Sequence, residues 1–533
     1  MAIKKHGEGI VLTWVGHWTV LQGIHGPYVD LIFWNKGQPP MFNDLTAPRH
    51  VDSLVVQTSA GPVRGIRDGQ VSAFHAVPYA AAPVGSLRFA APEDPQPWAE
   101  ARDCTQPGPS APQNASRLDA VMGISKFSQS EDCLNVSIWT PAADGRKRPV
   151  FVWIHGGAYM SGGGDQSFYT GGQLANRGDI VVVNLTFRLG VLGYLYAPGI
   201  GANRGLLDQI HALKWIHANI ANFGGDPHAI TVGGQSAGGG SLMALLVHPA
   251  SAGLIRRAIV QSAPGQCLTI VQAREVSTLF FAKAGLREDD IVGLRALEIP
   301  KILAVQSAVV MDYAARAGRL LPFQLVAGQP DVPDQPAKGI GGGSAPDVAM
   351  MLGWTRDEMH AWFAQDANFT SVTALEDLAK FPAGKDLPES TWEQLRHSTA
   401  ADAKPWEALG QLLSEQVFGS VAKSIADSRT SRGCETYVYR FDWRPTPKSK
   451  YGACHCIEIP FMFGNFAGWP ISPMLEGANP EVLREVTNAV QAGWIGFVRT
   501  GKPGGGVLPN WPARSANKRA VMVFDERTHI EDH

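Results

Sequence analysis

Residues 230–240 decide the fold, and they read Ile-Thr-Val-Gly-Gly-Gln-Ser-Ala-Gly-Gly-Gly. A β-branched run ends here in glycines, and the helix-forming run Ser-Leu-Met-Ala-Leu-Leu-Val follows it. This order predicts a sharp, strained strand-to-helix turn with Ser236 at its apex. Gly234 and Gly238 lack the Cβ atoms that would collide where the two arms approach each other. Such a turn lifts one hydroxyl above a sheet, where it can act as a nucleophile.

Apolar runs separated by helical patterns extend along most of the chain. Strands are expected at residues 150–154, 180–184, 230–232, 258–261, 348–353, 436–441 and 520–524, and helices at 206–222, 239–247, 276–284, 406–426 and 480–500. Most of these strands are too apolar to be half exposed, which is typical of parallel strands. The sequence therefore predicts an α/β fold with a large, mostly parallel central sheet, helices on both faces and long insertions. Two alternating runs, at 54–58 and 63–67, predict an antiparallel hairpin.

Composition and charge indicate one large globular domain. The chain has 533 residues, of which 45% are hydrophobic and 18% are charged, and no linker-like tract divides it. We expect residues 54–533 to form a single domain and residues 1–53 to form an N-terminal extension. The formal net charge of −2 offers no broad basic surface, so neither nucleic acid nor an anionic membrane is an expected partner.

The N-terminal residues leave two cellular locations open. Lys4 and Lys5 precede an apolar run at 10–21 that could pass for a short signal-peptide core. Residues 16–18, Gly-His-Trp, interrupt this run, and no small-residue cleavage motif follows it. We therefore expect a cytoplasmic protein, with export as the alternative. No uninterrupted apolar run has the length needed to span a bilayer.

Ser236 needs help from other residues, because a serine hydroxyl is a poor nucleophile at neutral pH. A base must lie within hydrogen-bond reach, and a third group must orient that base. Around nucleophile turns of this kind the chain order is serine, acid, histidine. The acid is therefore expected from the strand at 347–353 and its loop, and the histidine from further along the chain.

Candidate oxyanion donors flank the same serine. Residues 155–158, His-Gly-Gly-Ala, follow an expected strand, and their small side chains let backbone N–H groups approach a substrate oxygen. The N–H groups of Gly157 and Ala158 are two candidates. That of Ala237 is a third, because the first N–H groups of a helix have no intrahelical acceptor.

The six cysteines predict neither a metal site nor a disulfide scaffold. Cys454, His455 and Cys456 stand together, but a zinc site needs four converging ligands and no second Cys/His pair at ligand spacing accompanies them. We expect no metal and no organic cofactor, because acyl transfer to a serine requires neither.

Short motifs of one protein family recur in order from about residue 54 to the end. They include Pro-Val-Gly-Ser-Leu-Arg-Phe at 83–89, Ser-Glu-Asp-Cys-Leu-Asn at 130–135, Trp-Ile-His-Gly-Gly-Ala at 153–158, and further stretches at 187–190, 205–209, 223–227, 233–239, 261–262, 355–358, 455–461 and 463–464. With these motifs the chain resembles the type-B carboxylesterases, the cholinesterase and lipase group of the α/β-hydrolase fold. Coincidence over so many ordered motifs is negligible.

The resemblance assigns roles to particular residues. Ser236 corresponds to the family nucleophile, Glu358 to the acid and His455 to the base, and Ser262 to a serine that commonly bonds within this triad. Spacing alone leaves the choice open: Asp357 could replace Glu358, and nothing in the spacing selects His455 among fifteen histidines.

The resemblance also implies two internal ion pairs with a structural role, Arg88 with Glu131 and Arg188 with Asp226. A third implied link is weaker. Cys133 matches a cysteine that is disulfide-bonded in many relatives, but Ala111 occupies the usual partner position. Cys104 lies nearby, yet we do not expect a bridge, which slightly favours a reducing compartment.

Four positions depart from the family pattern. Ala158 stands where a third glycine is often found, Gln235 where a glutamate often precedes the nucleophile, and Thr186-Phe187 where Asn-Tyr is common. None of these changes removes a catalytic group.

We therefore expect hydrolysis of a small-molecule carboxylic ester through an acyl-enzyme. Apolar residues in the insertions at 160–169, 264–268 and 309–336 favour an uncharged or weakly polar ester. The same machinery could act on amides, carbamates or thioesters. A non-catalytic binding protein of the same fold is a less favoured alternative, since such proteins usually lack the nucleophile.

Overall fold

The computed structural model describes residues 53–317, 321–398 and 403–532, together with four strands between residues 2 and 35. The chain divides into two compact units, Met1–Val51 and Asp52–His533. The first unit contains β1 (Ala2–His6), β2 (Gly9–Thr13), β3 (Trp18–Ile24) and β4 (Val29–Asn35), paired antiparallel in that order. The apolar run at 10–21 lies partly outside the described residues, and the domain boundary at residue 53 stays a prediction.

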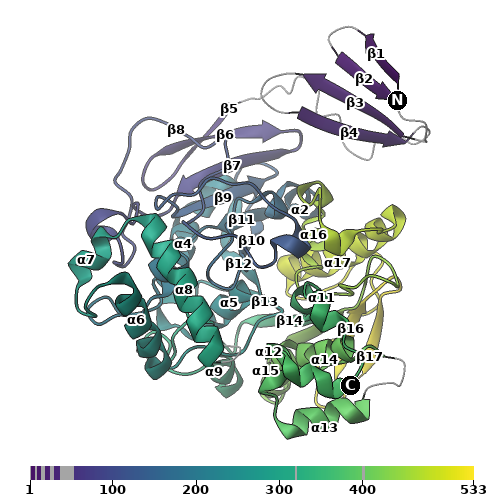
Figure 1. Ribbon diagram of the computed structural model, residues 1–533. Coiled ribbons are helices and arrows are strands. Elements are labelled where there is room, and N and C mark those ends of the chain that lie inside the picture. The colour runs from purple at the N-terminus through teal and green to yellow at the C-terminus, as the bar shows by residue number, and fades with distance from the viewer. Residues whose placement is uncertain are drawn as a thin grey trace. The chain divides into compact units, whose positions relative to one another are not determined.

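The larger unit is built on one thirteen-stranded sheet. Its strands are β5 (Ser53–Gln57), β6 (Pro62–Asp68), β7 (Val71–Pro78), β8 (Arg102–Asp103), β9 (Asn135–Thr140), β10 (Arg148–Ile154), β11 (Val181–Leu185), β12 (Gly225–Gln235), β13 (Arg257–Gln261), β14 (Ala349–Thr355), β15 (Thr436–Phe441), β16 (Ala520–Phe524) and β17 (His529–Asp532). The sheet order is β17-β16-β15-β14-β13-β12-β10-β11-β9-β7-β6-β5, with β8 paired to β6, and the labels β5 to β14 in Figure 1 follow it.

All strands from β11 through β10, β12, β13, β14 and β15 to β16 pair in parallel. The flanking strands β5, β6, β7 and β9 on one side, and β17 on the other, pair antiparallel. The predicted mostly parallel sheet is confirmed. The predicted hairpin is confirmed as well, by the pairing of β5 with β6.

Helices lie between the strands. They are α1 (Asp119–Met122), α2 (Gly172–Gly178), α3 (Gly190–Tyr194), α4 (Arg204–Asn219), α5 (Ala237–Val247), α6 (Ile270–Ala284), α7 (Ile291–Ala296), α8 (Ile299–Ala317), α9 (Pro336–Gly342), α10 (His360–Phe363), α11 (Ala367–Thr370), α12 (Pro382–Lys385), α13 (Glu389–Ser398), α14 (Pro405–Ser414), α15 (Ser420–Thr430), α16 (Ile459–Phe463) and α17 (Pro480–Thr500). The helix expected at 406–426 is interrupted by a π-helical turn at Glu415–Gly419.

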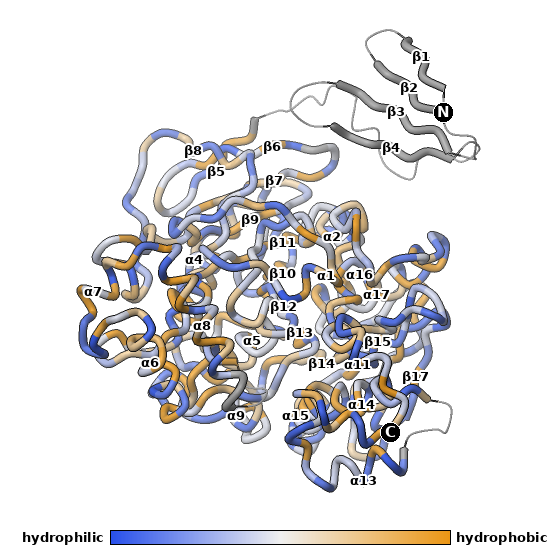
Figure 2. The backbone as a smooth tube through the Cα atoms, viewed as in Figure 1, coloured by the Kyte–Doolittle hydropathy of each residue, from blue (hydrophilic) through white to orange (hydrophobic). Residues whose placement is uncertain are grey.

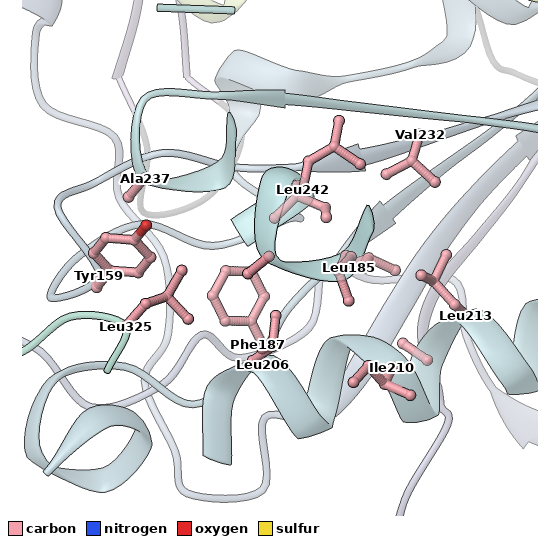
Figure 3. Close-up of a cluster of buried hydrophobic side chains, with 14 of the residues drawn as sticks. Tyr159, Leu185, Phe187, Leu206, Ile210, Leu213, Val232, Ala237, Leu242 and Leu325 are labelled. Atoms are coloured by element: carbon pink, nitrogen blue, oxygen red, sulfur yellow. The ribbon is translucent and has the colours of Figure 1, made fainter. Parts of the chain in front are cut away.

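Two buried clusters fill the two faces of the sheet. Alternate residues of β10 enter different clusters: Val150, Val152 and Ile154 join one, and Phe151 and Trp153 the other. The first cluster includes residues of α4 and α5, part of which Figure 3 shows, and the second includes residues of α17. Figure 2 shows apolar and polar residues interspersed along helices such as α8, as helices that cover a sheet require.

Of the two ion pairs that the resemblance implies, the pair of Arg88 with Glu131 is present. The prediction that Arg188 pairs with Asp226 is wrong. Arg88 pairs with Glu131, with its Nε 2.6 Å from Oε1. Arg188 pairs with Asp208 of α4 rather than with Asp226, and its Nη2 and Nε lie 2.6 Å and 2.8 Å from the two carboxylate oxygens. The reason is burial: both Arg188 and Asp208 are enclosed in the core, where a cation requires a carboxylate beside it.

Two further features concern the cysteines and the helices. All six cysteines carry free thiols, so Cys104 and Cys133 are not bridged. Among the described residues, we find no helix with the length and apolar character to cross a membrane.

Replacing Asp208 by Asn leaves the Arg188 guanidinium buried without its counter-charge. The apparent free energy of unfolding in urea should fall by about 3–5 kcal/mol. Asp226→Asn is the matched control, because among the described residues the Asp226 side chain accepts just the N–H of His228, and its effect should stay within about 0.5 kcal/mol. Equal effects of the two substitutions would contradict the pairing.

Candidate active site

Ser236 lies at the junction of β12 and α5 in a strained backbone conformation, with φ 56° and ψ −123°. A Cβ on Gly234 would lie 2.4 Å from the carbonyl oxygen of Gly238, and one on Gly238 would lie 2.1 Å from that of Ile154. Neither distance leaves room for a methyl group. The sharp turn and its two obligatory glycines therefore exist as the sequence predicts.

The loop after β10 lies against this turn. A Cβ on Gly156 would come within 3.1 Å of the Ser236 Cβ. Gly157 has φ +114°, and a Cβ there would lie 1.9 Å from the carbonyl oxygen of Ser161, so only glycine fits. Ala158 also has a positive φ, of 56°. Within the described residues, the N–H groups of Gly157 and Ala158 donate to no backbone acceptor and are free to bind an oxyanion.

Aromatic contacts hold the loop in place. The hydroxyl of Tyr159 packs on α5, since a Cβ on Gly240 would lie 2.3 Å from it, and Tyr159 belongs to the same buried cluster as Ala237 (Figure 3). The ring of His155 stacks on Phe187, with centroids 4.6 Å apart. Phe187 is one of the positions that departs from the family pattern, and here it supports the loop.

His155 itself is a structural residue. Its Nδ1 lies 2.7 Å from the carbonyl oxygen of Gly156. Burial lowers the pKa of His155 to about 4, so the ring is neutral at neutral pH. Neutral Nδ1–H then donates to the carbonyl and fixes the first residue of the loop.

His455 and Glu358 meet in the core. The Nδ1 of His455 forms a short hydrogen bond with Oε2 of Glu358, and both side chains are fully buried. The second carboxylate oxygen of Glu358 accepts the N–H of Thr355 at 2.8 Å. A carboxylate at Nδ1 fixes the tautomer in which Nε2 carries the lone pair, which is the arrangement a general base needs.

Asp357, the alternative acid, faces elsewhere. Its carboxylate pairs with the Arg356 guanidinium at 2.8 Å and accepts the N–H of Ala453 at 2.8 Å. Burial raises the pKa of Asp357, but the hydrogen bond and charge of Arg356 outweigh this effect and hold that pKa below its usual value. The structure therefore places Glu358, and not Asp357, against the imidazole.

Two aromatic rings flank His455. Trp362 of α10 and Phe418 lie with their ring centroids 5.0 Å and 5.3 Å from the imidazole. Phe418 belongs to the π-helical turn, a feature that often occurs at functional sites. Burial acts to lower the pKa of His455, whereas the neighbouring Cys456 and the Glu358 carboxylate act to raise it, and the net direction is upward.

The Nε2 of His455 faces Gln235 in this structure. The Gln235 Nε2 lies 3.2 Å from it, and within the described residues the Ser236 hydroxyl makes no hydrogen bond. Among the described residues, no hydrogen bond joins Ser236 to His455, whereas one joins His455 to Glu358. Hydrogen bonds of this kind often tighten only in the complex with substrate.

Comparison with known proteins decides the family. The family model described as the carboxylesterase family matches residues 52–533. The chain belongs to the carboxylesterase family. It is 34% identical to the para-nitrobenzyl esterase of Bacillus subtilis over 90% of this chain and 96% of that protein. It is 36% identical to the phenmedipham hydrolase of Pseudarthrobacter oxydans over 89% of this chain and 95% of that protein.

A crystal structure of a Geobacillus stearothermophilus carboxylesterase matches with a TM-score of 0.79, at 32% identity over 90% of this chain and 97% of that one. The α/β-hydrolase fold is confirmed. The protein is a serine carboxylesterase, a carboxylic ester hydrolase, as the sequence predicts.

Ser262 makes no side-chain hydrogen bond to the other candidate residues in the described part of this carboxylesterase. It has a positive φ of 45°, and its N–H donates to the carbonyl of Gly353 at 2.8 Å. Its hydroxyl is buried and has no hydrogen-bond partner among the described residues. The structure therefore does not bring Ser262 into a hydrogen bond with His455 or Glu358.

Sequence reasoning gave no role to Glu458, whose carboxyl group interacts electrostatically with Glu358 and His455. Burial, assisted by the charge of Glu358, raises the pKa of Glu458 to about 7. Gln261 donates to its Oε1 at 3.2 Å and accepts from the indole of Trp494 at 3.0 Å. The signal that could have pointed to Glu458 is its position: it is a carboxylate three residues after His455 in an otherwise apolar motif.

Metal-binding groups do not gather at the site. Within the described parts of the chain, no cluster of three or more His, Cys, Asp or Glu side chains is suited to hold a metal ion. The thiol of Cys454 lies against Met474, and that of Cys456 faces Gln235. The thiols of Cys454 and Cys456 therefore point in different directions and do not converge on one point beside His455.

If His455 acts as the base, replacing Glu358 by Gln should lower kcat/KM by about 10⁴-fold, because the imidazole loses the carboxylate that fixes its tautomer. In the native enzyme the midpoint of the acid limb should lie above pH 6.5, since a raised pKa keeps the imidazole protonated and inactive at lower pH. In Glu358→Gln the residual activity should show this midpoint at lower pH. A pH series of kcat/KM measures both effects.

Asp357→Asn is the control for this experiment. It weakens the contact with Arg356 but leaves the imidazole untouched, so kcat/KM should change far less than in Glu358→Gln. Equal losses in the two variants would mean that Glu358 is not the acid.

Proposed function

We propose that this carboxylesterase forms its acyl-enzyme on Ser236, with His455 as general base and Glu358 as the acid that orients it. The observation that carries the proposal is the buried hydrogen bond from His455 to Glu358, with Nε2 directed toward the segment that carries Ser236. The strained turn at Ser236 supports the role of nucleophile. Residues 54–533 form the catalytic domain in this proposal.

The reaction follows from this arrangement. Ser236 attacks the ester carbonyl while His455 Nε2 takes its proton, and the negative charge of Glu358 stabilises the imidazolium that forms. The proton then passes from His455 to the leaving alcohol. In the second half of the reaction, water attacks the acyl-enzyme while His455 takes its proton, and this proton passes to Ser236 as the carboxylic acid product leaves. The N–H groups of Gly157, Ala158 and Ala237 hold the oxyanion in both halves.

We also propose an uncharged or weakly polar ester as the substrate. Side chains that flank the base and the oxyanion loop are largely aromatic, namely Trp362, Phe418, Phe187 and Tyr159. Apolar walls favour a substrate without charge. Relatives named para-nitrobenzyl esterase and phenmedipham hydrolase support a small organic molecule of this kind.

Amides, carbamates and thioesters form the second candidate class, because their hydrolysis uses the same nucleophile, base and oxyanion donors. A panel of p-nitrophenyl, aryl and alkyl esters graded by acyl length, tested beside the matching amides and thioesters, separates the classes. Higher kcat/KM on the amides than on the matching esters would overturn the ester proposal. For the cellular location we propose the cytoplasm, which the six free thiols support.

Replacing Ser236 by Ala should reduce turnover of p-nitrophenyl esters by about 10⁶-fold, because the nucleophile and its base act as one unit. The variant should also lose labelling by a fluorophosphonate probe. Ser262→Ala is the matched control, since the Ser262 hydroxyl makes no hydrogen bond among the described residues, and it should remain labelled. A Ser236→Ala enzyme that keeps most of its activity would refute the assignment.

A further inference from the structure

Gln235 occupies a position next to the reacting groups that no step above uses. It is the last residue of β12, it directly precedes Ser236, and it is only 1% exposed. Its side-chain nitrogen lies 3.2 Å from Nε2 of His455, and its side-chain oxygen lies 3.6 Å from the thiol of Cys456. One carboxamide therefore connects the base to the residue that follows it.

The direction of these hydrogen bonds follows from the tautomer of His455. Its Nδ1–H donates to Glu358, so Nε2 holds a lone pair and accepts a hydrogen bond. The Gln235 N–H is the donor that faces this lone pair. Its oxygen in turn accepts from the Cys456 thiol, whose burial raises its pKa and keeps it protonated.

The carboxamide is confined where it stands. A Cβ on Gly156 would lie 2.7 Å from the Gln235 Oε1, so the side chain is packed against the start of the oxyanion loop. On the other side Cys456 adopts a positive φ of 75°, which turns its thiol toward the amide. Gln235 is thus enclosed between the loop that would hold the oxyanion and the residue that would take the proton.

We propose that Gln235 is a positioning residue for His455: it holds the imidazole ring in place before substrate binds and gives up the single Nε2 lone pair to the Ser236 hydroxyl during the reaction, and because it is uncharged it sets the pH above which the base is active. This inference rests on the proposed function of His455 as the general base.

The other groups around His455 differ in charge. Glu358, from the segment after β14, supplies a negative charge at Nδ1, and Glu458 and Cys456 lie on the same segment as the base. Trp362 and Phe418 supply uncharged rings. A carboxylate at position 235 would therefore be the first negative charge in hydrogen-bond contact with the Nε2 side of the ring.

Gln235→Glu tests the inference, because it keeps the size of the side chain and adds that charge. A negative charge near the imidazole stabilises its protonated form, so the pKa of the base rises and activity is lost at higher pH. The acid-limb midpoint of kcat/KM for a p-nitrophenyl ester should move about 1–3 pH units upward. Activity should return on the alkaline side of the new midpoint.

Gln235→Met is the matched control, because it is close in size and adds no charge. It removes the hydrogen bond to Nε2, so kcat on the pH plateau should fall with little change in KM, while the midpoint should move less than in Gln235→Glu. Thermal melting of both variants monitors folding. Should Gln235→Glu not fold, an unchanged plateau kcat in Gln235→Met would still overturn the positioning role.

The two proposals fail in different ways. Equal losses at every pH in Gln235→Glu and Gln235→Met, with an unmoved midpoint, would mean that Gln235 is merely structural. If Ser236→Ala meanwhile abolishes turnover and fluorophosphonate labelling, the proposed function stands and only this inference is wrong. Full activity of Ser236→Ala would overturn the proposed function first.

Discussion

The close approach of three backbone segments around Ser236 is the constraint on which the rest of the site depends. A Cβ on Gly238 would lie 2.1 Å from the Ile154 carbonyl, and one on Gly234 would lie 2.4 Å from the Gly238 carbonyl. Because no side chain separates them, the end of β10, the end of β12 and the first turn of α5 are held at backbone distance. This contact brings the oxyanion loop and the strained serine to the same edge of the sheet.

The acid–base half of the site is held by burial and by a backbone hydrogen bond, in which the N–H of His455 donates to the carbonyl oxygen of Glu358 at 3.3 Å. Glu358 and His455 are 97 residues apart in sequence, and each follows a strand of the parallel part of the sheet. Enclosure between Trp362 and Phe418 removes water from the imidazole, so its hydrogen bond to Glu358 acts in a medium of low polarity. The sheet brings Glu358 and His455 close together. The rings of Trp362 and Phe418 provide the apolar surroundings in which the imidazole would act as a base.

What the sequence predicted well depends on backbone shape and on local patterns. The turn at Ser236 could be predicted because glycine spacing reports contacts between adjacent segments, and the strands because apolar runs report burial. The partner of Arg188 was predicted wrongly, because Asp208 and Asp226 are both plausible in sequence and only packing buries Asp208 beside it. The π-helical turn that carries Phe418 and the contact from Gln235 to His455 also depend on side chains distant in sequence, for which a single chain gives no local signal.

The distribution of charge around His455 explains how an uncharged amide serves at position 235. Glu358 already places a negative charge at Nδ1. Burial, together with this charge, raises the pKa of Glu458 to about 7, so the Glu458 carboxyl keeps its proton below that pH. A further carboxylate at Nε2 would attract the same proton that, in the proposed mechanism, His455 returns to the leaving alcohol. The Gln235 N–H supplies a hydrogen bond without that attraction. Among the described residues the negative group in hydrogen-bond contact with the ring lies at Nδ1, and in the proposed reaction Nε2 can take a proton from Ser236 once the Gln235 N–H has moved away, and give it up in the next step.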